Sequence, residues 1–417
     1  MEEHEIERAV LAGLYADCFK KEEQATEATL DELEALLETA GGVCAAKLLQ
    51  SRHAPDPHSF LGEGKAQELR ELCELHGAGM VVFDNDLSPS QIRALEEITG
   101  VTVLDRSALI LDIFAQRART AEGRLQVELA QYKYLLPKLS GMGKSLSRLG
   151  GGIGTRGPGE TKLETDRRHI RARIDRLEEE LEQVRKLRAV ERRRRQKNEI
   201  PVVALVGYTN TGKSTLLNRL TGANIPANDR LFDTLDTTTR QLELSDRLTV
   251  LLSDTVGFIA KLPHHLVDAF RATLEELQYA DLLIHVIDAA DPDREEHIEI
   301  VEKLIGRLAK PETPVIRCYN KADLVGPEAL PVGPGNVAIS AKTGQGMEAL
   351  FARMERELCK DLRRAVFLLP YSMGGQVETL HDKARVFRVD YTAAGIEIEA
   401  EVDEVLFGRL AQYEIVR

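Results

Sequence analysis

The segment 207–214 has the residue types and the spacing of a phosphate-binding loop. Its sequence, GYTNTGKS, matches the pattern G-x-x-x-x-G-K-S/T, with the apolar stretch 201–207 before it and a helix-like stretch after it. Glycines let backbone N–H groups surround phosphate oxygens, the lysine reaches the β- and γ-phosphates, and the serine hydroxyl ligates Mg²⁺. We therefore expect a nucleoside triphosphate site in which Lys213 and Ser214 make the main polar contacts.

Three further motifs follow strand-like stretches in the order that a GTPase requires. In Asp254–Gly257, the aspartate can hold Mg²⁺ through water and the glycine amide can sense the γ-phosphate. In Asn320–Asp323, the Asp323 carboxylate only accepts hydrogen bonds, which suits the N1–H and amino donors of guanine and rejects adenine. Ser340–Lys342 offers backbone groups to the guanine O6. Together these motifs predict a GTP-hydrolysing domain.

A threonine-rich stretch, 228–240, lies between the first two motifs. A switch segment must supply a threonine whose hydroxyl ligates Mg²⁺ and whose amide meets the γ-phosphate. The residue types leave four candidates open, namely Thr234, Thr237, Thr238 and Thr239. From the four motifs we expect GTP contacts at Gly207, Tyr208, Thr209, Asn210, Thr211, Gly212, Lys213, Ser214, Thr215, Asp254, Thr255, Val256, Gly257, Asn320, Lys321, Ala322, Asp323, Ser340, Ala341 and Lys342.

Phe258 stands directly after the second motif, where Ras-type GTPases use a glutamine to orient the attacking water. A phenylalanine cannot hydrogen-bond water, so we expect slow intrinsic hydrolysis, with a partner or an ordered loop supplying the missing polar contact. A phenylalanine on a mobile surface loop would also be an exposed apolar side chain. We therefore expect Phe258 to dock against a partner.

The pattern of apolar residues predicts an α/β chain of four parts. In residues 1–118, strand-like runs alternate with amphipathic helices, which is typical of a parallel sheet; the helix that begins at 108 is expected to leave this part. Residues 119–199 predict a helical hairpin, 200–360 a second α/β domain that holds the GTPase motifs, and 361–417 a small α+β domain. The expected strands are 9–15, 42–50, 79–84, 101–105, 366–371, 384–391 and 396–402, and the expected N-terminal helices are 29–41, 66–77 and 89–100.

The hairpin is predicted to be a two-helix coiled coil with a glycine-rich tip. Its first helix spans 125–139 with Pro137 marking the end, and glycines crowd the tract 150–159. The second helix carries a narrow apolar stripe formed by Ile170, Ile174, Leu177, Leu181, Val184 and Leu187. Residues 138–197 hold 18 Lys and Arg against 9 Asp and Glu, although the whole chain has a net charge of −13. This local positive excess favours a polyanionic partner.

The composition excludes several classes of protein. With 43% hydrophobic and 29% charged residues, the chain is not disordered throughout. It has no apolar run of the ~18 residues that a membrane span needs, and its acidic start argues against a secretory leader. Five scattered cysteines without a C-x-x-C pair indicate free thiols, so we expect a cytoplasmic protein.

The sequence GGIGTRGPGETKLETDRR (151–168), directly upstream of the phosphate loop, resembles the HflX family of ribosome-associated GTPases, which belongs to the TRAFAC class. The stretch 105–131 is similar to that family as well, and the resemblance covers roughly residues 5–360. The C-terminal part resembles an extension found in only some members. The resemblance implies a monomeric GTP-driven switch that binds the large ribosomal subunit and dissociates or rescues ribosomes under stress.

The resemblance also assigns roles to particular residues. The family's switch motif matches FDTLD, which adds Phe232, Asp233, Thr234, Leu235 and Asp236 to the GTP contacts and favours Thr234 as the Mg²⁺ ligand beside Ser214, with Asp254 acting through water. Lys213, Thr234 and Gly257 are then the expected catalytic groups. Asn210 matches an asparagine that ligates a monovalent cation in related GTPases, so K⁺ is an expected stimulant. The residues expected near ribosomal RNA are Arg156, Gly157, Gly159, Glu160, Lys162, Arg167 and Arg168.

Three alternatives stay open. The protein could be a checkpoint in the assembly of the large subunit, or it could regulate a protein partner through a docking arm formed by the hairpin. The short G-x-G-K pattern of Gly62–Lys65 could hold a second, adenine nucleotide, with an ATP-driven remodelling of RNA. Glycine and lysine at a helix start are also ordinary capping residues, and for that reason we expect the N-terminal domain to dock on RNA or protein.

Overall fold

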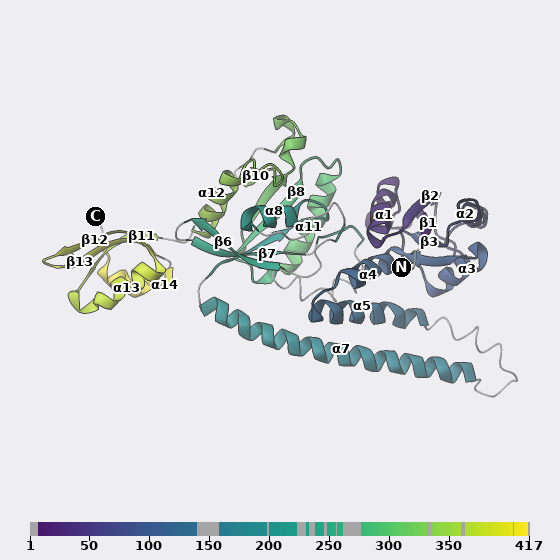
Figure 1. The fold of residues 1–417 in the computed structure, drawn as a ribbon, viewed down its shortest axis with the longest axis horizontal. Helices are drawn as coiled ribbons and strands as arrows, with labels where there is room; N and C mark the ends of the chain where they lie inside the picture. Colours follow the sequence, from purple (N-terminus) through teal and green to yellow (C-terminus); the bar gives the residue numbers. More distant parts are fainter. Residues whose placement is uncertain are drawn as a thin grey trace, which may run out of the picture.

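The computed structural model shows three sheets and a long helical hairpin (Figure 1). The N-terminal unit and the GTP-binding unit lie next to each other, and the hairpin runs along both. The C-terminal unit lies beyond the GTP-binding unit, at the end of the molecule opposite the N-terminal unit. The residues that the structure describes are 7–139, 158–197, 200–222, 231–232, 238–245, 248–255, 257–261, 277–331, 333, 335–359, 363–402 and 404–415.

The N-terminal unit contains a parallel sheet with the strand order β2-β1-β3-β4. Its elements are β1 (Arg8–Ala16), α1 (Glu27–Ala40), β2 (Val43–Arg52), α2 (Glu63–His76), β3 (Met80–Phe83), α3 (Pro89–Thr99) and β4 (Thr102–Asp105). Helix α1 begins where the Thr26 side chain accepts a hydrogen bond from the Thr29 amide, and it ends at Gly41, which has a φ of +97°. The predicted parallel α/β arrangement is confirmed.

Helix α4 (Arg106–Arg117) corrects one expectation, because it does not leave the N-terminal unit. Its apolar residues include Leu109, Ile110, Ile113 and Phe114, all of which are buried. A helix that is apolar over most of its circumference must be covered on more than one side. Helix α4 therefore packs against α1 and contributes to the core of this unit.

The hairpin consists of α5 (Ala121–Leu139) and α7 (Pro158–Lys197), which lie side by side (Figure 1). Pro137 lies inside α5, two residues before Leu139, and does not mark its end. Its ring removes one N–H donor from the last turn. The apolar stripe of α7 is buried against α5 through Ile174, Leu177 and Leu181. Two ion pairs, Arg173–Glu128 and Arg188–Glu122, both at 2.7 Å, flank this seam.

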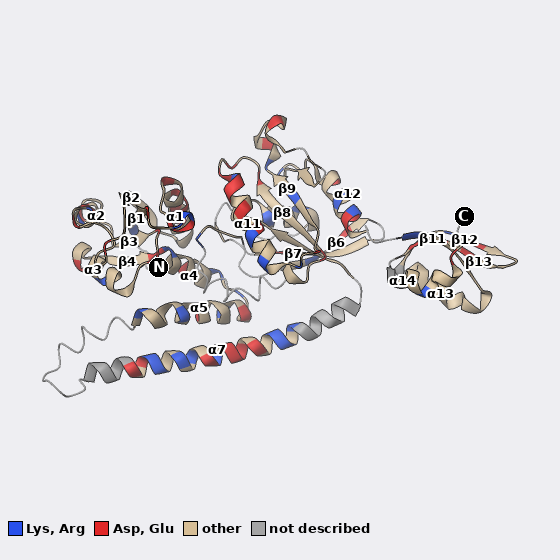
Figure 2. Ribbon diagram, turned by 180° about the vertical axis from the view of Figure 1, so that it is seen from behind, with Lys and Arg blue, Asp and Glu red and all other residues tan. Residues whose placement is uncertain are grey.

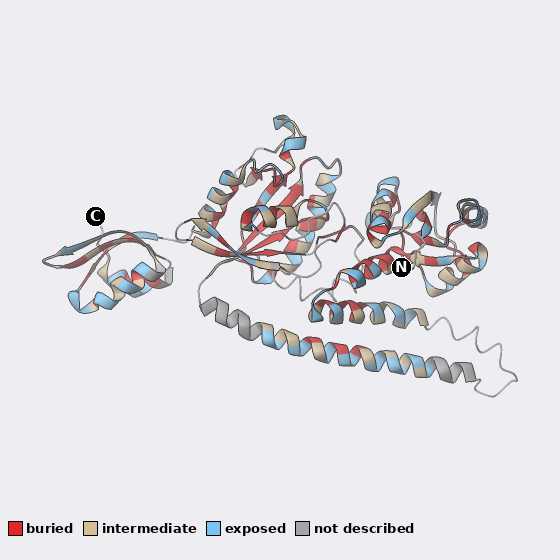
Figure 3. Ribbon diagram, in the orientation of Figure 1, coloured by how far each residue is buried: buried red, intermediate tan, exposed pale blue. Residues whose placement is uncertain are grey.

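The GTP-binding unit is a six-stranded sheet with the order β10-β9-β8-β5-β7-β6, in which only the pairing of β6 with β7 is antiparallel. Its elements are β5 (Val202–Val206), α8 (Lys213–Thr221), β6 (Thr238–Ser245), β7 (Leu248–Asp254), β8 (Leu282–Asp288), α11 (Arg294–Leu308), β9 (Val315–Asn320), β10 (Asn336–Ala338) and α12 (Met347–Leu358). The central strands β5 and β8 are buried almost throughout, whereas Val315 and Arg317 of β9 are exposed. The carboxyl ends of the parallel strands meet at one edge of the sheet (Figure 3). The four motifs stand at this edge, which is where α/β sheets bind ligands.

The C-terminal unit is an antiparallel sheet with the order β11-β13-β12, covered on one face by helices, as predicted for an α+β fold. Its elements are β11 (Arg363–Leu369), α13 (Gly374–Lys383), β12 (Arg385–Thr392), β13 (Gly395–Val402) and α14 (Glu404–Leu410). Phe367 and Ile398 are fully buried in its separate core. Short 3₁₀ helices occur at Lys21–Glu23, Ala322–Leu324, Pro327–Ala329, Tyr371–Met373 and Ala411–Tyr413.

One apolar core joins the N-terminal unit to the GTP-binding unit. Leu37 and Phe114 of the first unit belong to the same buried cluster as Leu231, Phe232 and Ile259 of the second. The rings of Phe114 and Phe232 meet edge to face, with centroids 4.6 Å apart. Since both flanks of the nucleotide site contribute to this core, the N-terminal unit lies directly against the segments that surround the site.

Candidate GTP-binding site

The phosphate loop connects β5 to α8 through a backbone that needs glycine at two positions. Gly212 has a φ of +88°, and a Cβ there would lie 2.3 Å from Asn320 Nδ2. At Gly207, a Cβ would lie 2.2 Å from the carbonyl oxygen of Val286. Both distances are shorter than any real contact, so no other residue fits without a shift of the loop. The close approach lets the loop curl ahead of the N-terminus of α8.

Lys213 lies inside this curled loop with 6% of its surface exposed. Its Nζ donates hydrogen bonds to the carbonyl oxygens of Gly207, at 3.1 Å, and Tyr208, at 2.6 Å. Burial lowers the pKa of Lys213 to about 8, and the nearby Asp254 carboxylate partly opposes that shift. The ammonium group is thus placed at the centre of the loop, where phosphate oxygens would replace the carbonyl groups.

The pH dependence of GTP binding should report this buried lysine. Below pH 8 the ammonium is charged and ready for phosphate; above pH 8 the free protein loses that proton and must take it up again to bind GTP. The affinity should therefore fall by up to about tenfold per pH unit above 8, with proton uptake approaching one per GTP near pH 9. Calorimetry in buffers of different ionisation enthalpy measures the uptake. Lys213→Arg should abolish it, because arginine stays protonated.

Ser214 and Asp254 bring two hard oxygen ligands together, as a Mg²⁺ site needs. The Ser214 Oγ donates to Asp254 Oδ2 at 2.9 Å, and Asp254 is completely buried at the end of β7. The next residue, Thr255, donates from its hydroxyl to the carbonyl oxygen of Leu205 at 2.6 Å, which fixes the end of β7 against β5. The residues fit Mg²⁺, which would neutralise phosphate charge there. The residue that would complete the set, Thr234, lies outside the described residues, as do Asp233, Leu235, Asp236 and Val256.

Asn320 connects the guanine motifs to the phosphate loop. Its side-chain Nδ2 donates to the carbonyl oxygen of Thr211 at 2.8 Å, and its Oδ1 accepts from the Ala341 amide at 2.9 Å. The amide of Asn320 is thus used within the protein, whereas the Asp323 side chain is exposed. Lys321 has a φ of +60° and pairs with Asp288 at 2.7 Å. Asn320 thus joins the motif 320–323 to the phosphate loop and to the motif 340–342.

Phe258 corrects another expectation, because it is buried within the chain and does not wait for a partner. Only 2% of it is exposed, and it belongs to the core that joins the two units. Its backbone pairs with the phosphate loop: the Phe258 amide donates to the carbonyl oxygen of Gly207 at 3.1 Å, and the Thr209 amide donates to the carbonyl oxygen of Phe258 at 2.7 Å. Position 258 still lacks a polar side chain that could orient water. The prediction that Phe258 is exposed, however, is wrong.

Tyr208 has a role that the motif did not indicate. Its hydroxyl donates to the Glu32 carboxylate and accepts from the Ala260 amide at 2.7 Å, while its ring stacks on His297 with centroids 3.7 Å apart. The side chain therefore faces the N-terminal unit. No local signal could have revealed this, because Glu32 is 176 residues away in the sequence.

The residues of the alternative second nucleotide site, Gly62–Lys65, make contacts within the protein. Gly62 is the N-cap of α2, and its amide donates to Gln50 Oε1 at 2.9 Å. Lys65 pairs with Glu68 at 2.8 Å, one turn further along the helix. Gly62 and Lys65 are thus both engaged by contacts within the N-terminal unit, as ordinary residues at a helix start are.

Comparison with known proteins finds family models along most of the chain. Three family models match: "GTP-binding GTPase N-terminal" over residues 27–115, "GTP-binding GTPase Middle Region" over 117–195 and "50S ribosome-binding GTPase" over 202–321. GTPase HflX of Caldanaerobacter subterraneus is 49% identical over 410 residues, which is 98% of this chain and 94% of the relative. This chain belongs to the HflX family. GTPase HflX of Escherichia coli is 46% identical over 374 residues, 88% of this chain and 87% of the relative.

HflX membership makes the chain a P-loop GTPase that hydrolyses GTP, with the Mg²⁺ dependence typical of such enzymes. Among solved structures, it is similar to a GTP-binding protein from the archaeon Sulfolobus solfataricus in complex with GDP. That likeness has 23% sequence identity and a TM-score of 0.44, and it covers 85% of this chain and 99% of the other. Within the described residues, no helix is long and apolar enough to cross a membrane.

Proposed function

We propose that this HflX GTPase binds the large ribosomal subunit in its GTP state and promotes the dissociation or rescue of ribosomes under stress. The family model over residues 202–321, described as a 50S ribosome-binding GTPase, supports the partner. The observation that carries the proposal is the hairpin. The part of α7 that lies away from the GTP-binding unit carries Lys and Arg interspersed with Asp and Glu (Figure 2), and a polyanion could reach these cations.

The shape of the hairpin supports contact with structured RNA. Helix α7 has 40 residues, which corresponds to a length of about 60 Å. Arg168 and Arg171, toward its N-terminal end, are exposed, whereas Arg173 is held by Glu128 through two oxygens. RNA phosphates would attract the first two, and the third would stiffen the arm. Of the other expected RNA contacts, Arg167 is half-buried, Gly159 lies in α7, and Arg156, Gly157 and the side chains of Glu160 and Lys162 lie outside what the structure describes.

In the GTP-binding site we assign Lys213 to the charge on the β- and γ-phosphates, Ser214 and Thr234 to Mg²⁺, and the Gly257 amide to the γ-phosphate. Asp323 would select guanine. Since Phe258 has no group that can orient water, intrinsic hydrolysis should be slow until another component supplies the missing interaction. Contact with the ribosome would do this and so couple hydrolysis to release.

Potassium is the proposed stimulant, because Asn210 stands on the exposed face of the phosphate loop. It has a φ of +57°, a conformation that asparagine tolerates better than most residues, and it is exposed in the loop that would hold the phosphates. Turnover of GTP should be several-fold faster in K⁺ than in Na⁺ at equal ionic strength, and Asn210→Ala should remove the difference. Equal rates in both salts for the unaltered protein would contradict the assignment.

The rival in which the hairpin docks on a protein partner keeps only part of the apolar stripe as an exposed surface, at Leu187. Ile174, Leu177 and Leu181, which would make such a contact, are buried against α5. A checkpoint in the assembly of the large subunit would use the same surfaces of the protein. The two roles differ in the particle that is bound, since a checkpoint would prefer immature subunits to mature ones.

Co-sedimentation with purified large subunits tests the proposal. The double variant Arg168→Gln, Arg171→Gln should weaken binding. It should also reduce the steepness of log affinity against log salt by about one to two, because each phosphate contact that is lost no longer releases a counterion from the RNA. Arg176→Gln with Lys186→Gln, two exposed cations further along the same helix, is the control that removes equal charge. The proposal would be contradicted if the affinity for large subunits were the same with GTP and GDP and were unchanged by Arg168→Gln with Arg171→Gln.

A further inference from the structure

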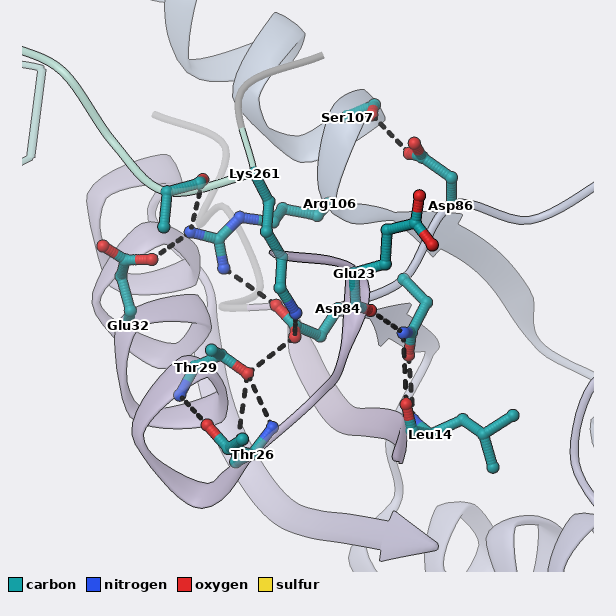
Figure 4. Close-up of polar contacts among 12 residues, drawn as sticks. Leu14, Glu23, Thr26, Thr29, Glu32, Asp84, Asp86, Arg106, Ser107 and Lys261 are labelled. Carbon is teal, nitrogen blue, oxygen red and sulfur yellow. Dashed lines mark hydrogen bonds and ion pairs between the residues drawn. The ribbon is translucent and has the colours of Figure 1, made fainter. Parts of the chain in front are cut away.

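A group of charged and polar side chains lies buried where the N-terminal unit meets the GTP-binding unit (Figure 4). Its members come from five separate parts of the chain, and we call them the interdomain cluster. They are Glu32, Asp84, Arg106, Tyr208 and Lys261. Two carboxylates face two cations, so the cluster is balanced in charge although it is shielded from water.

Arg106 is the centre of the N-terminal half of the cluster, with only 2% of its surface exposed. Its Nη1 donates to Asp84 at 2.8 Å, and its Nη2 donates to Glu32 and to the carbonyl oxygen of Ala260 at 3.3 Å. Asp84 is itself buried and accepts from the Thr29 hydroxyl at 2.7 Å. These bonds fix both carboxylates in the N-terminal unit.

The other half of the cluster belongs to the nucleotide site. Tyr208, in the phosphate loop, donates to Glu32, and Lys261, four residues after Gly257, forms an ion pair with Asp84. Figure 4 shows Lys261 reaching toward the Asp84 carboxylate beside Arg106. Glu32 therefore holds the phosphate loop, and Asp84 holds the segment 257–261 that follows the γ-phosphate motif.

The segments on both flanks of the γ-phosphate position are held in unfavourable backbone conformations. Lys261 has a φ of +55° and Phe232 a φ of +57°, in the left-handed region that such residues avoid. Each is fixed by the N-terminal unit, Lys261 through Asp84 and Phe232 through the ring of Phe114. Strain of this kind persists only while neighbouring contacts impose it, and it is concentrated in segments that switch.

We propose that the interdomain cluster is a latch: Asp84 and Glu32 act as positioning residues that restrain the phosphate loop and the segment 257–261, and so slow nucleotide release and turnover. Binding of a γ-phosphate draws the Gly257 segment toward the nucleotide, which pulls Lys261 against its contact with Asp84. The position of the N-terminal unit then depends on the nucleotide, because GTP and GDP favour the latched state unequally. This inference rests on GTP hydrolysis and is independent of the ribosome proposal.

The test compares the rate of release of a fluorescent GDP, and kcat and KM for GTP, in the full chain. Lys261→Met keeps the length of the side chain and removes its charge, which leaves Asp84 with excess negative charge and should open the latch. Both GDP release and kcat should rise on the order of tenfold, a typical coupling between sites. Lys261→Arg should restore slow release. Lys303→Met is the control, since the Lys303–Glu22 pair at 3.8 Å crosses the same interface but is exposed.

Unchanged or slower GDP release in Lys261→Met, with the control equal to the unaltered protein, would overturn the latch. Because a buried substitution can disturb folding, a second measurement uses the unaltered chain. Hydrogen exchange of the amides in 80–86 and 257–261 should be faster with a non-hydrolysable GTP analogue than with GDP. Equal protection in the two states would also overturn it.

Discussion

Lys213→Ala will abolish measurable GTP hydrolysis. The substitution removes the one ammonium group that lies inside the phosphate loop, where it contacts the carbonyl oxygens of Gly207 and Tyr208. Removal of one preorganised group that stabilises transition-state charge costs about 10²–10³ in kcat, or about 3–4 kcal/mol, and weaker GTP binding adds to the loss. Turnover assays at saturating GTP, together with binding of a fluorescent GTP analogue, measure the two effects separately.

The same variant tests whether the chain has a second nucleotide site in its N-terminal unit, as one alternative interpretation of the sequence allowed. ATP turnover should be absent in both the unaltered chain and Lys213→Ala, because Gly62 and Lys65 are engaged by Gln50 and Glu68. Persistent ATPase activity in Lys213→Ala would show that the N-terminal unit holds a second nucleotide. Thermal unfolding of both proteins is the control for folding.

Asp323→Asn should change the base that the enzyme accepts. The exposed Asp323 carboxylate can accept both the N1–H and the amino group of guanine, whereas asparagine offers one acceptor and places a donor against a donor. A site built on hydrogen bonds rejects a mismatched partner strongly, so the affinity for GTP should fall about 10³-fold or more, which is about 4 kcal/mol. Xanthosine triphosphate has a carbonyl in place of the amino group and should bind the variant better than GTP.

Competition binding with GTP, ATP and xanthosine triphosphate provides the measurement. Asp293→Asn, an exposed carboxylate at the start of α11, is the matched control and should leave the preference for GTP intact. If Asp323→Asn still preferred GTP to xanthosine triphosphate, another residue would have to read the base.

The sequence predicted those features that depend on neighbouring residues. The glycines at 207 and 212 and the lysine after them stand within one short segment, and their chemistry can be deduced from that segment alone. Asp254, at the end of β7, is identified by its own motif and by the strand before it. Helix α1 was predicted over 29–41 for the same reason. Its end at Gly41 agrees with that prediction, whereas its N-cap, Thr26, lies three residues before the predicted start. The apolar stripe of α7 likewise predicted its own partner helix.

Contacts between distant segments could not be predicted. Tyr208 and Lys261 carry no sequence signal for Glu32 and Asp84, because either carboxylate would be equally acceptable on a solvated helix or loop. Phe258 was expected to be exposed for a related reason: its residue type gives its hydrophobicity but not the surface that covers it. Burial of Phe258 follows from the docking of the N-terminal unit, which is a property of the whole fold.

GTP turnover in potassium buffer, with and without purified large ribosomal subunits, tests the central claim most directly. Large subunits should stimulate the unaltered protein at least about tenfold, which is modest beside the ~10³–10⁵ that an arginine finger gives. The variant carrying Arg168→Gln and Arg171→Gln should keep its basal rate and lose the stimulation. Equal turnover with and without large subunits would contradict the proposal that the ribosome activates this GTPase.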